Sequence, residues 1–169
     1  MARLFLALWP DPQVREHLAR FRNAWTWPTG AKPVPDERLH ATLHFIGSFR
    51  CDDIPGLGER LAAVPASDML LRPDDTELWR GGVAVLRLEW VPALLALHEE
   101  LGHALEALGV PLDSRPFVPH VTLARKAAGA RRPETPGDLR WQASGFALVE
   151  SILGAQATYR VLRTYDSDR

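Results

Sequence analysis

Apolar and polar residues follow two different periods along this chain, and the period changes at prolines and glycines. The opening run from Leu4 to Leu8 is apolar and strand-like. Asp11 and Pro12 then provide an N-cap and a first helical residue. From Val14 to Trp25 the apolar residues recur at helical spacing. The pattern therefore predicts a strand followed by a helix that buries one stripe.

The same order of elements occurs a second time. The apolar run from Val83 to Leu88 precedes Pro92, which lies 80 positions after Pro12. The helix that begins at Pro92 carries its leucines on one face, and Gly109 ends it. A repeat with only two long copies differs from a solenoid. It indicates a duplicated α+β unit with pseudo-twofold symmetry.

The remaining pattern completes one α+β domain. We predict a helix after Asp53 that ends at Pro65, a hairpin at Gly81 and Gly82, and final strands over residues 141–153 and 158–164. No linker is long enough to divide the chain. We therefore expect residues 1–169 to form a single domain of two pseudo-symmetric lobes.

Each half also carries a His-x-Thr segment. His40 and Thr42 lie in the strand-like stretch 39–46, and His120 and Thr122 lie 80 positions later in the stretch 117–124. On a strand, residues i and i+2 point to the same face, so each segment presents an imidazole beside a hydroxyl. Two such strands facing each other would surround one small anionic group.

These residue types suit acid–base chemistry on a phosphodiester. Histidine has an unperturbed pKa of about 6.5, so it gives or takes a proton near neutral pH. In-line cleavage needs a base on the attacking oxygen and an acid on the leaving oxygen, which two histidines supply without a metal. Threonine hydroxyls stabilise the charge on the phosphate oxygens. The symmetry of the two segments does not assign acid and base.

Of the other four histidines, three are interpreted as structural and the role of His44 stays open. His17, His98 and His103 fit surface or boundary positions of helices. His44 follows His40 at the spacing of a helical zinc pair, but a strand would separate the two by about 13 Å. No third ligand cluster stands nearby, so no metal site is expected. His44 is predicted to lie further along the His40 face, near the cleft wall.

Composition restricts the partners of the protein. The formal net charge of −1 provides no bulk attraction to nucleic acid, so an RNA would be read only at its end. Cys51 is the only cysteine, which excludes an internal disulfide and suits a reducing cytoplasm. The opening apolar run is too short for a signal peptide, and no run approaches the roughly 20 residues of a membrane span. We expect a cytoplasmic monomer without a membrane partner.

The paired motifs resemble those of the two-histidine phosphoesterase superfamily. The chain is most similar to the RNA 2′,3′-cyclic phosphodiesterase family of bacteria and archaea, also called 2′-5′ RNA ligases. The similar segments are residues 39–47 and 115–125, with flanking similarity at 3–7, 150–153 and 159–162. The resemblance implies a bilobal α+β fold whose antiparallel sheets line a V-shaped cleft, with helices outside, and no metal or other cofactor. It also implies hydrolysis of RNA 2′,3′-cyclic phosphate ends to 2′-phosphates, tRNA fragments included, with possible reverse 2′-5′ ligation.

The resemblance also assigns roles to the motif residues. His40 would protonate the departing 3′ oxygen, and His120 would activate the water. Thr42 and Thr122 would bind the phosphate oxygens.

Two further residues would contact the terminal nucleotide by the same resemblance. Phe45 would stack on a base, and Arg125 would bind phosphate or base. Strict alternation places both on the face opposite the histidines, so they reach the cleft only if the strand twists, bulges or ends. Otherwise Phe45 belongs to the core and Arg125 to the surface at a strand end.

Three alternatives remain open. The same chemistry could act on a small cyclic nucleotide or on a cyclic phosphate of ADP-ribose. A non-catalytic module that binds RNA ends would use the cleft alone, although a pure binder has no need of an acid and a base. A 3′-5′ exonuclease is another activity found in the wider superfamily.

Overall fold

Two antiparallel sheets of four strands and three α-helices form most of the molecule. The computed structural model describes residues 1–155 and 157–167. The strands are β1 (Ala2–Leu8), β2 (Lys32–Pro33), β3 (Ala41–Phe49), β4 (Met69–Leu71), β5 (Pro73–Trp79), β6 (Val83–Leu88), β7 (His120–Arg125), β8 (Trp141–Ala143), β9 (Gly145–Ile152) and β10 (Thr158–Asp166). The helices are α1 (Pro12–Asn23), α2 (Ile54–Ala62) and α3 (Pro92–Ala107), with short 3-10 turns η1 (Asp36–Arg38) and η2 (Cys51–Asp53). The prediction of an α+β fold is confirmed.

The two sheets share one strand pairing but differ in their full order. The first sheet has the order β10-β9-β1-β3 and the second has β2-β7-β6-β5. In each sheet the strand before a proline-initiated helix pairs with the strand that carries a His-x-Thr threonine, β1 with β3 and β6 with β7. A small third sheet of β4 and β8 joins the two. The two motif strands, β3 and β7, contact each other.

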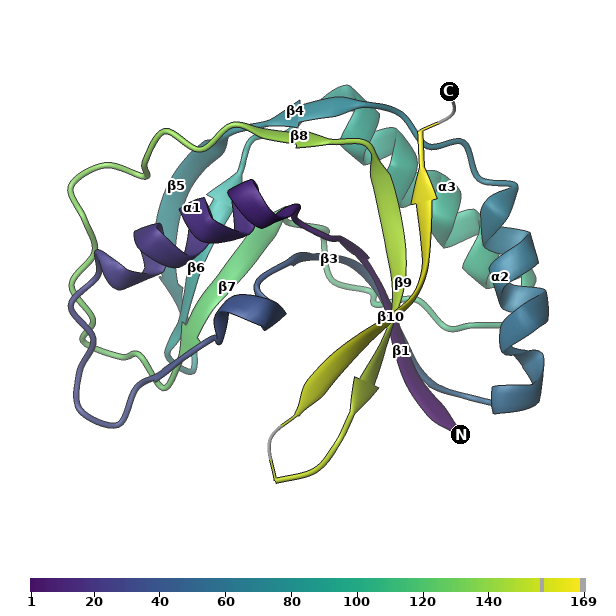
Figure 1. Ribbon diagram of the computed structural model, residues 1–169, viewed down its shortest axis with the longest axis horizontal. Coiled ribbons are helices and arrows are strands. Elements are labelled where there is room, and N and C mark those ends of the chain that lie inside the picture. The colour runs from purple at the N-terminus through teal and green to yellow at the C-terminus, as the bar shows by residue number, and fades with distance from the viewer. Residues whose placement is uncertain (156, 168–169) are drawn as a thin grey trace.

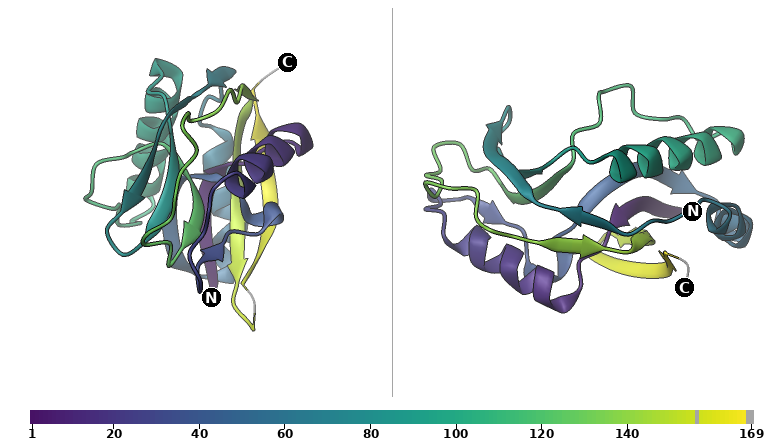
Figure 2. Two further views of the ribbon diagram at one scale, coloured as in Figure 1. Left: turned by 90° about the vertical axis from the view of Figure 1, so that its left-hand side faces the viewer. Right: turned by 90° about the horizontal axis from the view of Figure 1, so that it is seen from above.

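The helices lie on opposite sides of the strands (Figure 2). In Figure 1, α1 lies in the left half with β5, β6 and β7, whereas α2 and α3 lie in the right half with β1, β9 and β10. The Asp11 carboxylate caps α1 by accepting a hydrogen bond of 2.8 Å from the Val14 amide. The leucine stripe of α3 is buried, as its spacing predicts. Among the described residues, no helix combines the length and hydropathy that crossing a bilayer requires.

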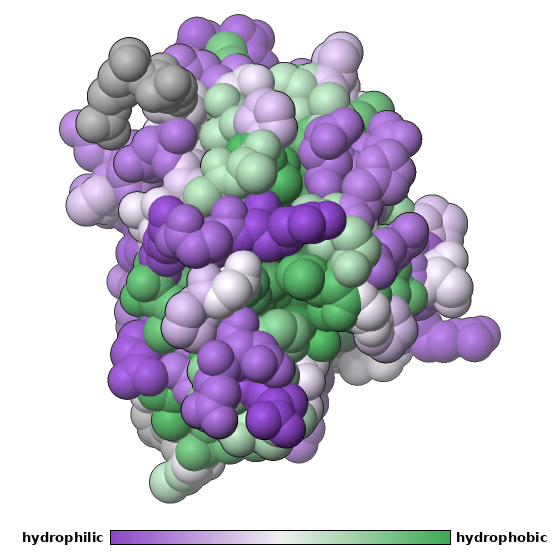
Figure 3. All heavy atoms as spheres, turned by 90° about the vertical axis from the view of Figure 1, so that its right-hand side faces the viewer, coloured by the Kyte–Doolittle hydropathy of each residue, from purple (hydrophilic) through white to green (hydrophobic). Residues whose placement is uncertain are grey.

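The molecular surface is mixed in character. Seen from the right-hand side of Figure 1, hydrophobic residues gather in the middle of the face and hydrophilic residues surround them and cross them as a band (Figure 3). The core itself is continuous through both halves, and leucines of β1, β6 and α3 are among its most buried members.

The strands differ from the predicted ranges, since β3 extends to Phe49 and β10 to Asp166, and three other differences have a clear physical reason. β3 begins at Ala41, because the amide of Leu39 closes η1 by donating to Asp36 and does not pair with β1. β7 begins at His120, since Pro119 has no amide hydrogen for a sheet. The single strand predicted over residues 141–153 is divided into β8 and β9. Gly145 stands at the division with a φ of 146°, and a Cβ there would lie 1.8 Å from the carbonyl oxygen of Tyr165.

Candidate active site

The two motif histidines use the same backbone contact to fix their rings. Nδ1 of His40 lies 2.6 Å from the carbonyl oxygen of Arg38, and Nδ1 of His120 lies 2.6 Å from that of Val118. A carbonyl only accepts hydrogen bonds, so each Nδ1 carries the hydrogen in the neutral ring. Nε2 is therefore the atom that each histidine has available for proton transfer.

The fold brings the two motif strands together, since β3 and β7 belong to different sheets and contact each other. His40 directly precedes β3, and His120 begins β7. Burial is the main cause that lowers the pKa of His40, and the charge of His120 makes a smaller contribution in the same direction.

The two threonines share a face with their histidines. Thr42 Oγ1 lies 2.9 Å from Nε2 of His40, to which its hydroxyl donates. Thr122 and His120 pair with Val85 and Arg87, which are two positions apart on β6 and so point to the same side. In each sheet, we call the surface to which the motif histidine and threonine point the site face.

Aromatic rings surround the imidazole of His40. Trp9 stacks on it with ring centroids 5.6 Å apart, and Phe5 lies at 5.0 Å. Tyr159 approaches edge-on at 5.4 Å. Burial among these rings lowers the pKa of His40 to about 4, and the charges of Arg15 and His120 act in the same direction. His40 is therefore neutral at pH 7 in the unliganded protein.

The surroundings of His120 are more polar. The ring of Trp79 lies edge-on at 4.4 Å, and its Nε1 donates to Glu77 at 2.5 Å. Glu77 in turn pairs with Arg87 at 3.0 Å. Burial lowers the pKa of His120, and the charge of Arg125 contributes to the same shift.

A bulge in β3 determines where Phe45 points. Ala7 pairs with Thr42 and Phe5 pairs with Phe45, so two positions on β1 correspond to three on β3. The extra residue, Leu43, breaks the alternation and turns Phe45 to the same face as Thr42. Phe45 is 63% exposed, and its ring lies 6.4 Å from Phe5. The alternative of Phe45 as a core residue is therefore wrong.

β7 contains the equivalent bulge. Val85 pairs with Thr122 and Ala84 with Ala124, so Leu123 is the extra residue. The shift places Arg125 on the face of Thr122, where its charge acts on His120. Leu43 and Leu123 lie at the same distance after their histidines. Phe45 and Arg125, which follow the two bulges, therefore both point to the site face.

The same bulge makes our prediction for His44 wrong. His44 pairs with Leu6, a core residue, and its side chain turns away from the site face. Only 8% of His44 is exposed. Its Nε2 donates to the carbonyl of His98 at 2.8 Å, so it packs against α3 and does not line the site.

Sequence reasoning did not assign the rings around His40. Phe5, Ala7 and Trp9 alternate with leucines, which was the available signal that they share one face. Ala7 and Ala147 carry only methyl groups, and this leaves space for the Trp9 ring over the sheet.

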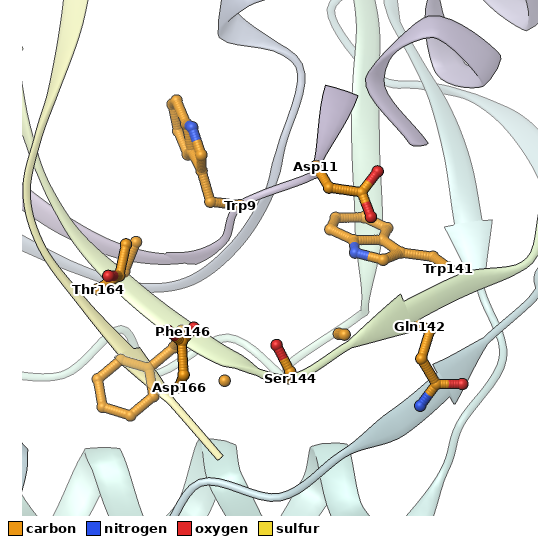
Figure 4. Close-up of a pocket in the computed structure, with 11 residues that line it drawn as sticks. Trp9, Asp11, Trp141, Gln142, Ser144, Phe146, Thr164 and Asp166 are labelled. Atoms are coloured by element: carbon orange, nitrogen blue, oxygen red, sulfur yellow. The ribbon is translucent and has the colours of Figure 1, made fainter. Parts of the chain in front are cut away.

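A hollow beside Trp9 lies next to the site face. It has a volume of about 110 Å³ and lies between the start of α1, the bend from β8 to β9 and the end of β10 (Figure 4). The labelled side chains around it include Asp11, Ser144 and Thr164. Within residues 1–155 and 157–167, no group of three or more His, Cys, Asp or Glu side chains is placed to hold a metal ion.

Comparison with known proteins gives a consistent picture. The family model described as LigT-like phosphoesterase matches residues 8–84 and 89–158. A Thermus thermophilus protein named RNA 2′,3′-cyclic phosphodiesterase is 34% identical over 96% of this chain and 89% of its own length. An Escherichia coli protein of the same name is 29% identical, covering 94% and 89%.

Solved structures agree with these relatives. The structure of E. coli LigT in its apo form has a TM-score of 0.88 at 27% identity and covers 99% of this chain and 98% of that one. A further structure of that protein, also with a TM-score of 0.88, is a complex with 3′-AMP.

Proposed function

The chain belongs to the LigT-like phosphoesterase family, and from this premise we propose that it hydrolyses RNA 2′,3′-cyclic phosphate ends to 2′-phosphates. One observation carries the proposal. Two imidazoles, one beside each of the contacting strands β3 and β7, have Nδ1 fixed by a backbone carbonyl, which leaves Nε2 for proton transfer.

The proposed reaction is a single in-line displacement at phosphorus. Nε2 of His120 takes a proton from water as the water oxygen attacks, and the bond from phosphorus to O3′ breaks. Nε2 of His40 gives its proton to O3′, which leaves the phosphate on O2′. Both proton transfers of the proposed step use imidazole groups, so the step includes no metal.

His40 must be protonated to act as the acid. Burial holds its pKa at about 4 in the unliganded protein. A bound cyclic phosphate brings a negative charge beside the ring, and an opposite charge favours the protonated form. We propose that substrate binding itself raises the pKa of His40 and so prepares the acid.

The threonines and the two residues after the bulges would hold the substrate. The hydroxyl of Thr42 would leave Nε2 of His40 and donate to a non-bridging phosphate oxygen, and Thr122 would do the same from the other half. The exposed ring of Phe45 offers a surface on which a base can stack. Arg125 would bind phosphate or base.

Ligation, which is the reverse of cleaving a 2′-5′ linkage to a cyclic phosphate, uses the same geometry. If a 5′-hydroxyl replaces water as the attacking group, the displacement of O3′ gives a 2′-5′ linkage. The proposal includes this ligation as a second activity. We also propose that the protein acts as a monomer in the cytoplasm, where Cys51 stays reduced.

The test uses a short RNA that ends in a 2′,3′-cyclic phosphate, incubated with the pure protein in EDTA. A 2′-phosphate end on the product supports the proposal. A 3′-phosphate end, or turnover that needs added zinc, contradicts it. Binding of the RNA without turnover identifies a binding module instead.

A small cyclic nucleotide is the second candidate substrate. The Asp74 and Glu77 carboxylates lie beside Arg87, on the half that carries His120. Their charge disfavours a long RNA along this half of the site. Comparison of kcat/KM for a cyclic mononucleotide and for a longer RNA with the same end decides between the two.

A further inference from the structure

The two bulges that turn Phe45 and Arg125 to the site face are held by different partners. In the second sheet, β2 lies beside β7 and pairs with it at Ala124 and Arg125. The amide of Val34 donates to the carbonyl of Leu123 at 2.8 Å. This bulge is therefore fixed by a neighbouring strand.

Within the described residues, no strand pairs with the outer edge of β3, because β3 is the outermost strand of its sheet. Instead, the histidine pair His44 and His98 connects β3 to α3. Nε2 of His44 donates to the carbonyl of His98 in α3 at 2.8 Å. The ring of His98 stacks on that of His44 and lies close enough to the backbone of Leu43 for that backbone to affect its pKa. Leu43 occupies the position in β3 that Leu123 occupies in β7. His44 thus connects β3 to α3 immediately after the bulge.

The pair is packed as a stack of three rings. The rings of His44 and His98 are 4.1 Å apart with an interplanar angle of 16°. Phe117 covers the other face of His98 at 3.8 Å and 9°. Gly102 of α3 lies against the stack, since a Cβ there would lie in van der Waals contact with the His44 ring, 3.4 Å from its Cε1.

The stack connects both motifs. His44 immediately precedes Phe45, and Phe117 immediately precedes Val118, whose carbonyl fixes the ring of His120. We propose that His44 and His98 are positioning residues, which hold the β3 bulge and thereby keep Phe45 on the site face for the base of the substrate. The inference rests on the proposed function, because it takes Phe45 as the residue that contacts the base.

The charged surroundings of the pair are compatible with neutral rings. Glu99, His103 and Glu106 of α3 line a hollow of about 240 Å³ beside the stack. Burial lowers the pKa of both His44 and His98, that of His98 to about 4. The neutral ring of His44 keeps its single hydrogen for the carbonyl of His98.

The experiment compares His44→Ala with His103→Ala. His103 lies on the same helix and borders the same hollow but is outside the stack, so it is the matched control. Two readouts are used: KM and kcat for adenosine 2′,3′-cyclic phosphate, and the Kd of 3′-AMP. We expect His44→Ala to raise KM and Kd about tenfold, in the lower range of what base stacking on an aromatic ring contributes, with kcat little changed. His103→Ala should change neither.

Two further variants make the result specific to the bulge. His44→Gln keeps an N–H that can reach the His98 carbonyl, so it should recover most of the binding, and it also serves if His44→Ala does not fold. In a Phe45→Ala background, His44→Ala should add little, because the residue it positions is gone. Equal Kd values for His44→Ala and the natural protein, or fully additive effects with Phe45→Ala, would overturn the inference.

The two proposals fail differently. If the natural protein binds 3′-AMP but opens no cyclic phosphate, the proposed function is wrong, and the Kd comparison still decides the role of His44. If it turns over the cyclic nucleotide with a KM that His44→Ala leaves unchanged, only the positioning role is wrong. If the natural protein neither binds 3′-AMP nor turns over the cyclic nucleotide, both proposals are wrong.

Discussion

The two halves of the molecule hold the same motif in different surroundings. On one side, three aromatic rings enclose His40 and lower its pKa to about 4. On the other, His120 lies beside Trp79, which is tied to the charged groups Glu77 and Arg87. Identical side chains with an identical Nδ1 contact therefore experience different environments. In the proposed mechanism, the different neighbours of the two imidazoles would allow one to serve as acid and the other as base.

The difference begins on the strands next to the motif strands. Thr42 pairs with Ala7 on β1 and Trp9 stacks on His40, whereas on β6 Thr122 pairs with Val85 and His120 pairs with Arg87. The methyl group lets aromatic rings lie over the first sheet, whereas the guanidinium organises Asp74 and Glu77 on the second. Residues outside the His-x-Thr segments thus determine the environment of each histidine.

Removal of either histidine tests the comparison most strongly. His120→Ala and His40→Ala should each reduce kcat by about 10²- to 10⁴-fold, because each removes one proton-transfer group. Steady-state kinetics with an RNA cyclic phosphate measures the loss, and circular dichroism checks that the fold is retained. Full activity of His120→Ala would disprove the mechanism.

The threonines should matter less. Thr122→Ala is expected to reduce kcat by about 10²- to 10³-fold, since it removes one hydrogen bond to the charge that develops on phosphate. Thr42→Ala should have a similar effect. Thr122→Ser keeps the hydroxyl and is the control, so a Ser variant as slow as the Ala variant would argue against a hydrogen-bonding role.

Trp9→Ala addresses the asymmetry directly. Loss of the indole exposes His40 to water, so the pKa of His40 should rise toward its ordinary value while that of His120 stays unchanged. NMR titration of the imidazole signals measures both values in one experiment. Trp9→Phe keeps an apolar ring and should leave the pKa of His40 low. A parallel rise at both histidines would show that Trp9 does not distinguish the two halves.

Of the effects predicted here, the contribution of His40 to the pH dependence of the free energy of unfolding should be the smallest. Its pKa is about 4 in the folded protein against 6.5 when unfolded, so the unfolded chain binds more protons between these values. The free energy of unfolding should therefore fall as the pH decreases from about 6.5 to 4, by at most about 1.4 kcal/mol per pH unit from this group.

Urea denaturation across this range, compared with His40→Gln, isolates that contribution. The difference in unfolding free energy between the two proteins should change over the pH window and be constant above it. A constant difference at every pH would mean that the pKa of His40 is not lowered by folding.

The sequence by itself determined the repeated order of elements. Prolines at helix starts, the leucine stripe of α3 and the glycine pair at the β5–β6 turn are local signals, and each acts within a few residues of the structure it specifies. The offset between His40 and His120 was also legible, because a duplicated unit carries its motif at a fixed distance. These features follow from short-range sterics and periodicity.

Only the tertiary structure decided which side chains share a face. Alternation alone puts Phe45 and Arg125 opposite the histidines and His44 beside them, and the two bulges reverse all three positions. The segments packed against the two bulges are distant in sequence, since α3 meets β3 through the His44–His98 hydrogen bond and β2 pairs with β7. The low pKa of His40 has the same origin, since Tyr159 and Trp9 reach it from strands at opposite ends of the chain. The chemistry of the motif is local, but its geometry depends on contacts that form only when the sheets assemble.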